Sequence, residues 1–343
     1  DLSKWRSAKL KFVLGVDVAA DNILNKRDGA CARYLNDCRH YGKTNMPRCL
    51  FFVGDSSKNI RSTGDAFVHT NDRTYVKAVF GKGDKNPNEL PPGVYRNYGI
   101  GETGFDVASC QFAIHYFFET EPILHNFLRN VSECVRIGGY FIGTTYDGET
   151  IFQQLKDKQP GDPWTIVQRG QQLAQITKEY DETAMPNDEN SIGMRIQVYQ
   201  ETINQTFPEY LVNFKYLQHL MELYGFVLVT DDEAQTKLGL QRGTGMFKEM
   251  YQKMENEVRS GMVPPNEYGN ALQMTKEEKK ISFLNRYFVF RKVHTVDTES
   301  IYKIVQNRNA SKQPAKDEPQ ETKGLNIVRT KKLKKKLVIS PEK

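Results

Sequence analysis

The chain has 343 residues, of which 38% are hydrophobic, which is enough to bury one large core and a smaller lobe and excludes a fibrous or fully disordered protein. Its 48 basic and 42 acidic residues give a net charge of +6, which favours an anionic partner only mildly. An odd set of 5 cysteines without a C-x-x-C pair, and no apolar run of membrane-spanning length, argue for an intracellular, reducing compartment. Because Cys31, Cys38, His40 and Cys49 match no established zinc spacing, we expect no metal.

Two apolar runs near the start of the chain predict strands that end in acidic side chains. A short helix is expected over residues 1–8. The first apolar run covers residues 11–18, with Asp17 at its end, and the second covers residues 48–55, which end with Asp55 and are followed by Ser56. A carboxylate at such a strand end can accept hydrogen bonds from both ribose hydroxyls, although aspartate also caps helices. Asp55 and Ser56 can read the polar edge of adenine, although an Asp-Ser pair also forms turns.

The stretch from Phe105 to Glu119, FDVASCQFAIHYFFE, predicts a buried parallel strand with polar residues where it stops. These residues are Gln111, His115 and Tyr116, and ligands of open α/β sheets bind beyond the carboxyl ends of the strands. A G-x-G-x-x-G pattern at residues 99–104 precedes this strand, whereas a cofactor loop follows a strand and opens a helix. We therefore interpret residues 80–104 as a surface insertion that holds no cofactor.

The rest of the chain predicts alternating helices and strands and then a tail. Gly138-Gly139 is expected to end a helix that starts at Pro122. Residues 149–192 predict only a short helix and polar sequence, and residues 193–203 alternate as an exposed edge strand does. From residue 306 the composition is typical of disorder, with a basic run at residues 331–336. The other predictions are strands at residues 140–146, 226–230 and 285–293 and helices at residues 122–135, 211–224 and 245–259.

Two motifs in this order resemble one known family. FDVASCQFAIHYFFE is followed by a helix and then by GGYFIGTTYDG, and this combination resembles the messenger RNA cap guanine-N7 methyltransferases. The resemblance spans about residues 1–293 and implies an α/β fold of the class I S-adenosylmethionine-dependent methyltransferases, with a Rossmann-like, mostly parallel sheet. It implies a methyltransferase domain at residues 1–305 with a cap-covering lobe within residues 149–224, a disordered basic tail at residues 306–343, S-adenosylmethionine as cofactor and 5'-capped RNA as partner. No membrane and no DNA sequence specificity are expected.

The resemblance also implies roles for individual residues. On the cofactor side, it assigns the ribose to Asp17, adenine to Asp55 and Ser56, and further contacts to Gln111 and Tyr116. On the cap side, it assigns the phosphates to Lys4 and Arg33, the walls of the guanine pocket to Phe112, Tyr146 and Tyr287, and the positioning of guanine to His115 and Glu209. Arg33 lies further from Asp17 than in the family, and Tyr146 stands where many members have proline.

The reaction that the resemblance implies is methyl transfer to guanine N7. Since N7 has a free in-plane lone pair and no proton, we expect in-line alignment and no general base, and we do not assign that role to His115. Positive charge moves onto guanine during the transfer, and Glu209 would stabilise that charge while accepting hydrogen bonds from N1 and N2. Two alternatives stay open: an inactive homologue that binds capped RNA or a partner as a scaffold, and a methyltransferase for another small nucleophile.

The first residues bear on what this chain can do alone. It begins with DLSKW, which in the family follows the glycine-rich loop that holds the methionine part of the cofactor. We therefore expect the first strand and this loop to be missing, and weak or absent activity from these residues alone. The TTYDG sequence is reminiscent of the capping enzymes of large DNA viruses, so upstream capping domains or an activating subunit are candidate partners. We expect the nucleus for a cellular protein and the host cytoplasm or virion for a viral one.

Overall fold

A computed structural model describes residues 2–312 of the chain. Its central sheet is formed by β3 (Phe105–Gln111), β4 (Val135–Tyr146) and β11 (Asn285–Lys292), in which β3 and β4 are parallel and β4 and β11 antiparallel. Two short strands, β9 (Phe226–Leu228) and β10 (Thr244–Met246), pair with β11. The predicted α/β class is confirmed.

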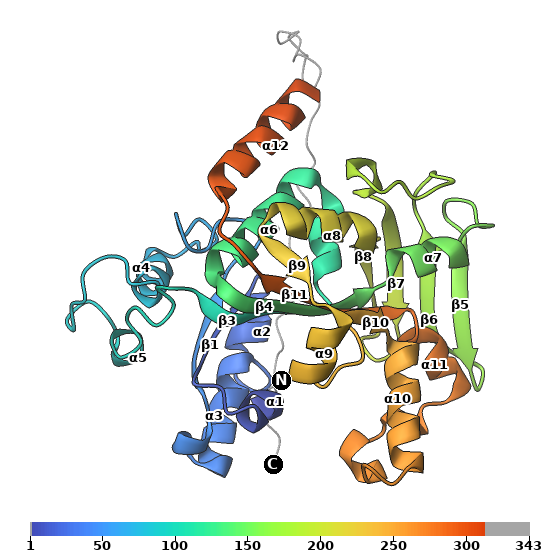
Figure 1. Cartoon of the computed structure of the whole chain (residues 1–343), viewed down its shortest axis with the longest axis horizontal. Helices are drawn as coiled ribbons and strands as arrows, with labels where there is room; N and C mark the ends of the chain where they lie inside the picture. Colours follow the sequence, from blue (N-terminus) through green and yellow to red (C-terminus); the bar gives the residue numbers. More distant parts are fainter. Residues whose placement is uncertain (1, 313–343) are drawn as a thin grey trace, which may run out of the picture.

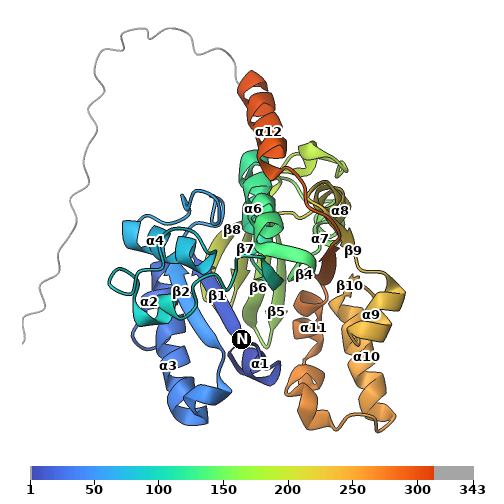
Figure 2. The same ribbon diagram turned by 60° about the vertical axis from the view of Figure 1, so that its left-hand side comes forward.

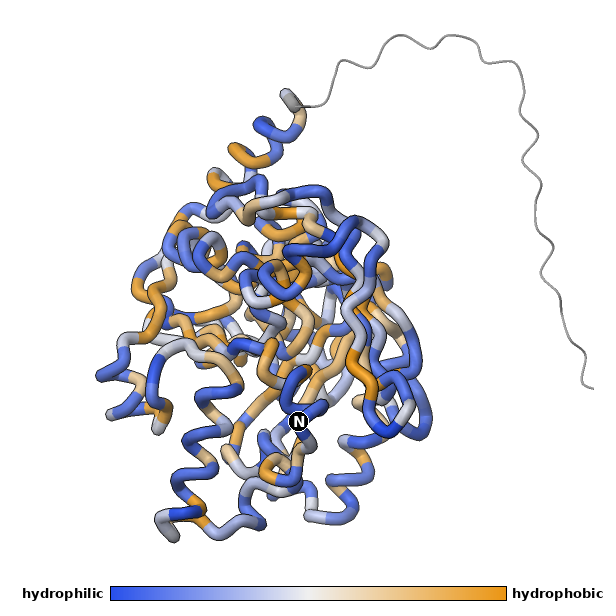
Figure 3. The backbone as a smooth tube through the Cα atoms, turned by 90° about the vertical axis from the view of Figure 1, so that its right-hand side faces the viewer, coloured by the Kyte–Doolittle hydropathy of each residue, from blue (hydrophilic) through white to orange (hydrophobic). Residues whose placement is uncertain are grey.

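The two faces of this sheet are covered by helices, as Figure 1 shows. Phe141, Phe288 and Phe290 point to one face and pack against α6 (Glu121–Cys134) and α8 (Phe214–Leu223) in the main core. Ile142 and Val289 point to the other face and pack near α9 (Asp231–Lys237). The hydrophobic stretches of the backbone accordingly gather in the middle of the molecule (Figure 3).

A second parallel pair, β1 (Phe12–Asp17) and β2 (Arg48–Val53), forms a separate two-stranded sheet (Figure 2), and β1 lies beside β3 in Figure 1. The rings of Phe12 and Phe105 stack at 6.1 Å between the two sheets, yet no strand within residues 2–312 pairs with the second edge of β1 or of β3. The parallel strand predicted at Phe105 is therefore present, but the prediction that it is buried was wrong. Val107, for example, is 46% exposed, because the backbone edge beside it is uncovered.

Residues 163–210 form a lobe whose strands, apart from the one predicted at residues 193–203, were not predicted from the sequence. Four antiparallel strands lie in the order β5 (Pro163–Gln168), β6 (Gln171–Lys178), β7 (Arg195–Gln200) and β8 (Gln205–Tyr210), and α7 (Gly148–Gln154) contributes to the same core. The prediction of an edge strand at residues 193–203 was wrong, because β7 pairs on both sides and buries Ile196 and Val198.

Two further predictions around the central sheet were wrong. The glycines Gly138-Gly139 do not end α6 but lie inside β4, where Gly138 has φ 76° and the partners of β3 shift from Val135 to Tyr140, as in a β-bulge. Residues 80–104 are not merely a surface insertion, because Leu90 and Val94 are buried against Ala78 of α4 (Thr70–Val79). This segment also contains α5 (Pro92–Tyr95).

Helix α12 (Thr298–Lys312) rises from the top of the molecule in Figure 1 and lies against α6. Arg129 of α6 pairs with Glu299 at 2.6 Å, and Arg308 pairs with Glu121. Residues 306–312 are therefore helical, contrary to the predicted tail, whereas residues 313–343 with their basic run lie outside the described residues. The remaining helices are α1 (Leu2–Ser7), α2 (Ala20–Leu24), α3 (Ala30–Tyr41), α10 (Phe247–Arg259) and α11 (Lys276–Ser282).

Candidate active site

Strand pairing brings the predicted site residues to the carboxyl ends of the parallel strands. Asp17 lies opposite Val53 at the ends of β1 and β2, shortly before Asp55. In the central sheet, Gln111 lies opposite Thr144, which lies opposite Tyr287. Since residues directly opposite each other point to the same face, these three side chains form a row across three strands.

The two aspartates predicted to bind the cofactor are already engaged in their own loops. Asp17 accepts hydrogen bonds from the backbone N–H of Ala19 at 2.8 Å and from the amide of Asn22 at 3.0 Å. Asp55 accepts from the N–H and the hydroxyl of Ser57 at 2.9 and 2.6 Å, so the turn that the sequence also allowed is present. These bonds fix the direction of both carboxylates and leave further lone pairs on their oxygens.

The row across the central sheet is held by side-chain hydrogen bonds. The hydroxyl of Thr144 donates to Oε1 of Gln111 at 2.9 Å, and the hydroxyl of Tyr287 donates to the carbonyl of Arg242 at 3.1 Å. Phe112, which follows β3, has φ 50° and is 52% exposed, with its ring 6.1 Å from that of Phe247 at the start of α10. A non-glycine residue in this left-handed region is strained, and the ring that it carries is largely exposed.

His115 and Glu209 meet although they are far apart in the sequence. His115 lies on the 3-10 helix Ile114–Glu119 after β3, Glu209 lies on β8 of the lobe, and His115 Nε2 is 3.6 Å from Glu209 Oε2. Both residues are buried, with 4% and 8% of their surface exposed. The ring of Tyr116 packs on His115 at a centroid distance of 4.2 Å. The carboxylate of Glu209, which belongs to the lobe, therefore lies beside the segment that follows β3 of the central sheet.

Burial shifts both members of this pair toward their neutral forms. It lowers the pKa of His115 to about 4 and raises the pKa of Glu209 to about 7. At neutral pH the imidazole is therefore uncharged, and the contact is not an ion pair in spite of its distance. Burial, followed by the charge of Glu209, also raises the pKa of Tyr116.

The same pair has hydrogen-bonding capacity that no residue within 2–312 uses. Both ring nitrogens of His115 and Oε2 of Glu209 are buried without a hydrogen-bond partner. Leaving such an atom unsatisfied costs about 1–3 kcal/mol. A polar ligand that bonds these atoms would recover that free energy.

Tyr146 belongs to the lobe core as much as to the central sheet. It ends β4, is 9% exposed, and packs with Ile176 and Met194 of the lobe. The side-chain amide of Gln200 on β7 donates to its hydroxyl oxygen at 2.7 Å. The sequence did not single out Gln200, because its role depends on strand pairing in a lobe that was not predicted.

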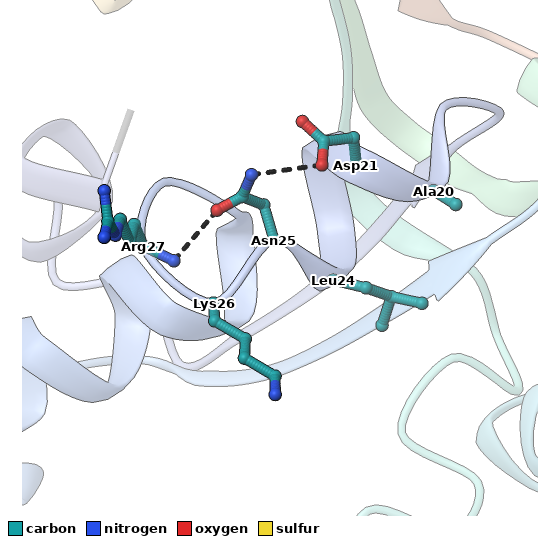
Figure 4. Close-up of a pocket in the computed structure, with 6 residues that line it drawn as sticks. All are labelled: Ala20, Asp21, Leu24, Asn25, Lys26 and Arg27. Carbon is teal, nitrogen blue, oxygen red and sulfur yellow. Dashed lines mark hydrogen bonds between the residues drawn. The ribbon is translucent and has the colours of Figure 1, made fainter. Parts of the chain in front are cut away.

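The two predicted phosphate contacts, Lys4 and Arg33, are exposed residues of α1 and α3, on elements other than those that carry His115 and Glu209. A surface hollow is lined by residues 20, 21 and 24–27, among which the amide of Asn25 donates to Asp21 at 3.0 Å (Figure 4). A second hollow lies next to β10. Neither hollow is lined by His115 or Glu209.

Within residues 2–312, no helix is long and apolar enough to cross a membrane, and no three His, Cys, Asp or Glu side chains are grouped to hold a metal ion. Solved structures with a similar chain path include an S-adenosylmethionine-dependent methyltransferase from Clostridium acetobutylicum, with a TM-score of 0.34, 13% identity, and 66% of this chain and 69% of that chain covered. The CcbJ methyltransferase from Streptomyces caelestis has a TM-score of 0.36 and 10% identity, over 85% and 88% of the two chains. Scores this low establish neither fold nor function.

A family model described as the mRNA (guanine-N(7))-methyltransferase domain matches residues 1–293. Similar proteins include the "Probable mRNA-capping enzyme" of Acanthamoeba polyphaga mimivirus, 27% identical over 90% of this chain and 26% of that protein. The mRNA cap guanine-N(7) methyltransferase of Candida albicans is 32% identical over 47% of this chain and 36% of that protein, and that of Schizosaccharomyces pombe is 30% identical over 67% and 50%. This chain spans between about a quarter and a half of the length of these relatives. The chain belongs to the mRNA (guanine-N(7))-methyltransferase domain family.

Proposed function

We propose that this chain transfers a methyl group from S-adenosylmethionine to N7 of the guanine cap of 5'-capped RNA. The observation that carries the proposal is the buried, unpartnered pair of His115 and Glu209. Guanine presents N–H donors at N1 and N2 on one edge, which an ionised Glu209 can accept together. Bringing such a base into the site would satisfy atoms that are otherwise buried without partners.

The side chains would act by position and charge. Guanine N7 has a lone pair and no proton, so no side chain has to remove one, and neutral His115 is suited to contact the base. As N7 is methylated, the guanine becomes cationic, and a carboxylate at its edge interacts more strongly with the product-like state than with neutral guanine. Burial keeps water from weakening that interaction.

The strand ends supply groups suited to the adenosine part of the cofactor. S-adenosylmethionine, when bound, supplies an electrophilic methyl group on a sulfonium sulfur. Each carboxylate oxygen of Asp17 accepts one hydrogen bond and retains a free lone pair, which fits two ribose hydroxyls. Asp55 and Ser56 follow the neighbouring strand and would contact adenine, and Gln111 would lie between the cofactor and the central sheet.

We further propose that one more strand, outside residues 2–312, fills the space between β1 and β3 and leads into the loop that holds the methionine part. The uncovered edges of β1 and β3 support this, since each presents a row of unpaired backbone N–H and C=O groups that can pair with another strand. The partial burial of every residue of β1 supports it as well, because a strand at this place in an α/β sheet is normally covered on both sides.

The test is transfer of labelled methyl groups by the protein, expressed with any residues that its gene encodes before Asp1. Label is expected in capped RNA and not in uncapped RNA. Cap binding without transfer would select the inactive scaffold, and label in another small acceptor would select a different methyltransferase. The likeness to cellular and viral capping proteins supports capped RNA as partner, in the nucleus or in the host cytoplasm or virion respectively.

A further inference from the structure

We propose that the hydroxyl group of Tyr146 donates a hydrogen bond to O6 of the cap guanine, and that this bond distinguishes guanine from adenine. The inference rests on the proposed function, because it adds a specificity residue to the site formed by His115 and Glu209.

The orientation of this hydroxyl is set by Gln200. Its oxygen accepts the amide of Gln200 at 2.7 Å, so the proton has to point elsewhere. Tyr146 is 9% exposed, and no acceptor for that proton is present within residues 2–312. Burial and the charge of Glu209 both raise the pKa of this phenol, so it stays protonated and able to donate at physiological pH.

Tyr146 and Glu209 border the same core of the lobe but are not hydrogen-bonded to each other. Tyr146 belongs to the buried cluster that contains Ile196 of β7, and Ile196 lies directly opposite Glu209 on β8, whose Oε2 has no partner within residues 2–312. A buried donor from β4 and a buried acceptor from β8 therefore lie beside the same cluster without satisfying each other. A ligand that bears an acceptor next to donors would satisfy both.

Guanine has that pattern, with the O6 acceptor beside the N–H donors at N1 and N2. Adenine carries an amino donor in place of O6 and has no proton on N1. It would therefore present a donor to the hydroxyl of Tyr146 and leave Glu209 with fewer hydrogen bonds. A site that hydrogen-bonds a specific group rejects analogues lacking it, because its own buried polar groups are then left unpaired.

The experiment compares Tyr146→Phe with the wild-type protein on two capped RNAs, one with guanosine and one with 6-thioguanosine in the cap. Sulfur at position 6 is a weak acceptor, whereas N1 and N2 keep their protons. With the guanosine cap, Tyr146→Phe is expected to lower kcat/KM about tenfold, as for removing one hydrogen bond to a buried acceptor. With the 6-thioguanosine cap the same change is expected to cost less than about twofold.

Tyr180→Phe is the matched control, because Tyr180 is a buried tyrosine of the same lobe core whose hydroxyl has no partner within residues 2–312. It is expected to affect both caps equally. An equal loss on both caps for Tyr146→Phe would overturn the O6 contact while leaving the proposed function intact. Selectivity between the two caps that disappears in His115→Ala but persists in Tyr146→Phe would assign O6 to His115 instead. Absence of transfer by the wild-type protein would overturn both proposals.

Discussion

Replacing Glu209 with glutamine is expected to stabilise the protein while it removes guanine recognition. Burial raises the pKa of this carboxyl group from 4.5 to about 7. The unfolded chain therefore releases the proton first as the pH rises, and the folded protein loses stability between pH 4.5 and about 7. At about 1.4 kcal/mol per pH unit, the loss amounts to about 3 kcal/mol of unfolding free energy, and glutamine avoids it because it does not ionise.

Urea unfolding at pH 5 and pH 8 measures this difference. Relative to the wild-type protein, Glu209→Gln should gain about 2.5 kcal/mol between the two pH values, because part of the loss has already occurred at pH 5 and titrations elsewhere in the protein cancel in the comparison. Glu201→Gln is the control, since Glu201 is an exposed glutamate of the same lobe and should follow the wild type. If Glu209→Gln gains no stability relative to the wild type at pH 8, the carboxylate is not strained by burial and the reasoning is refuted.

The wild-type kcat/KM for capped RNA should rise with pH through about 7 as Glu209 ionises. Glu209→Gln should give a flat pH profile with kcat/KM at least about 100-fold lower. Initial rates measured between pH 5.5 and 8.5 test both expectations. Asp17→Ala should raise KM for S-adenosylmethionine about tenfold or more with little change in KM for capped RNA; equal rises in both constants would contradict a ribose contact. Arg33→Glu should raise KM for capped RNA and weaken its salt dependence with kcat unchanged, and an unchanged salt dependence would remove Arg33 from the phosphate site. Arg129→Met should lower the urea unfolding free energy by about 3 kcal/mol, because it leaves Glu133 largely buried without its guanidinium partner; a loss below about 1 kcal/mol would count against this role.

The elements with long apolar runs could be predicted from the sequence. The strand after residue 104, helix α6 and the last strand β11 lie where the hydrophobic pattern indicated, because these segments bury one or both faces in the main core. The meeting of His115 with Glu209 was expected only through the family resemblance. No local pattern relates two residues whose contact depends on how the lobe folds back onto the central sheet.

The incorrect predictions of strands share one cause: each depends on pairing between segments that no local pattern reveals. β6 begins with Gln171 and Gln172 and shows little apolar periodicity, so the β5–β6 hairpin gave no signal, and β7 was read as an edge strand because its partners on both sides were unknown. The exposure of β3 depends on whether a second strand pairs with it. β3 pairs with β4 on one edge, and no strand within residues 2–312 pairs with its other edge, which the sequence of β3 alone does not indicate.

The most direct test is the nucleoside composition of capped RNA after incubation with labelled S-adenosylmethionine and the protein carrying any residues encoded before Asp1. Digestion followed by mass spectrometry is expected to give labelled 7-methylguanosine with the wild-type protein and almost none with Glu209→Gln. Label on a ribose oxygen or on an internal base, or 7-methylguanosine formed equally well by Glu209→Gln, would contradict a guanine held by Glu209 with N7 presented for methylation.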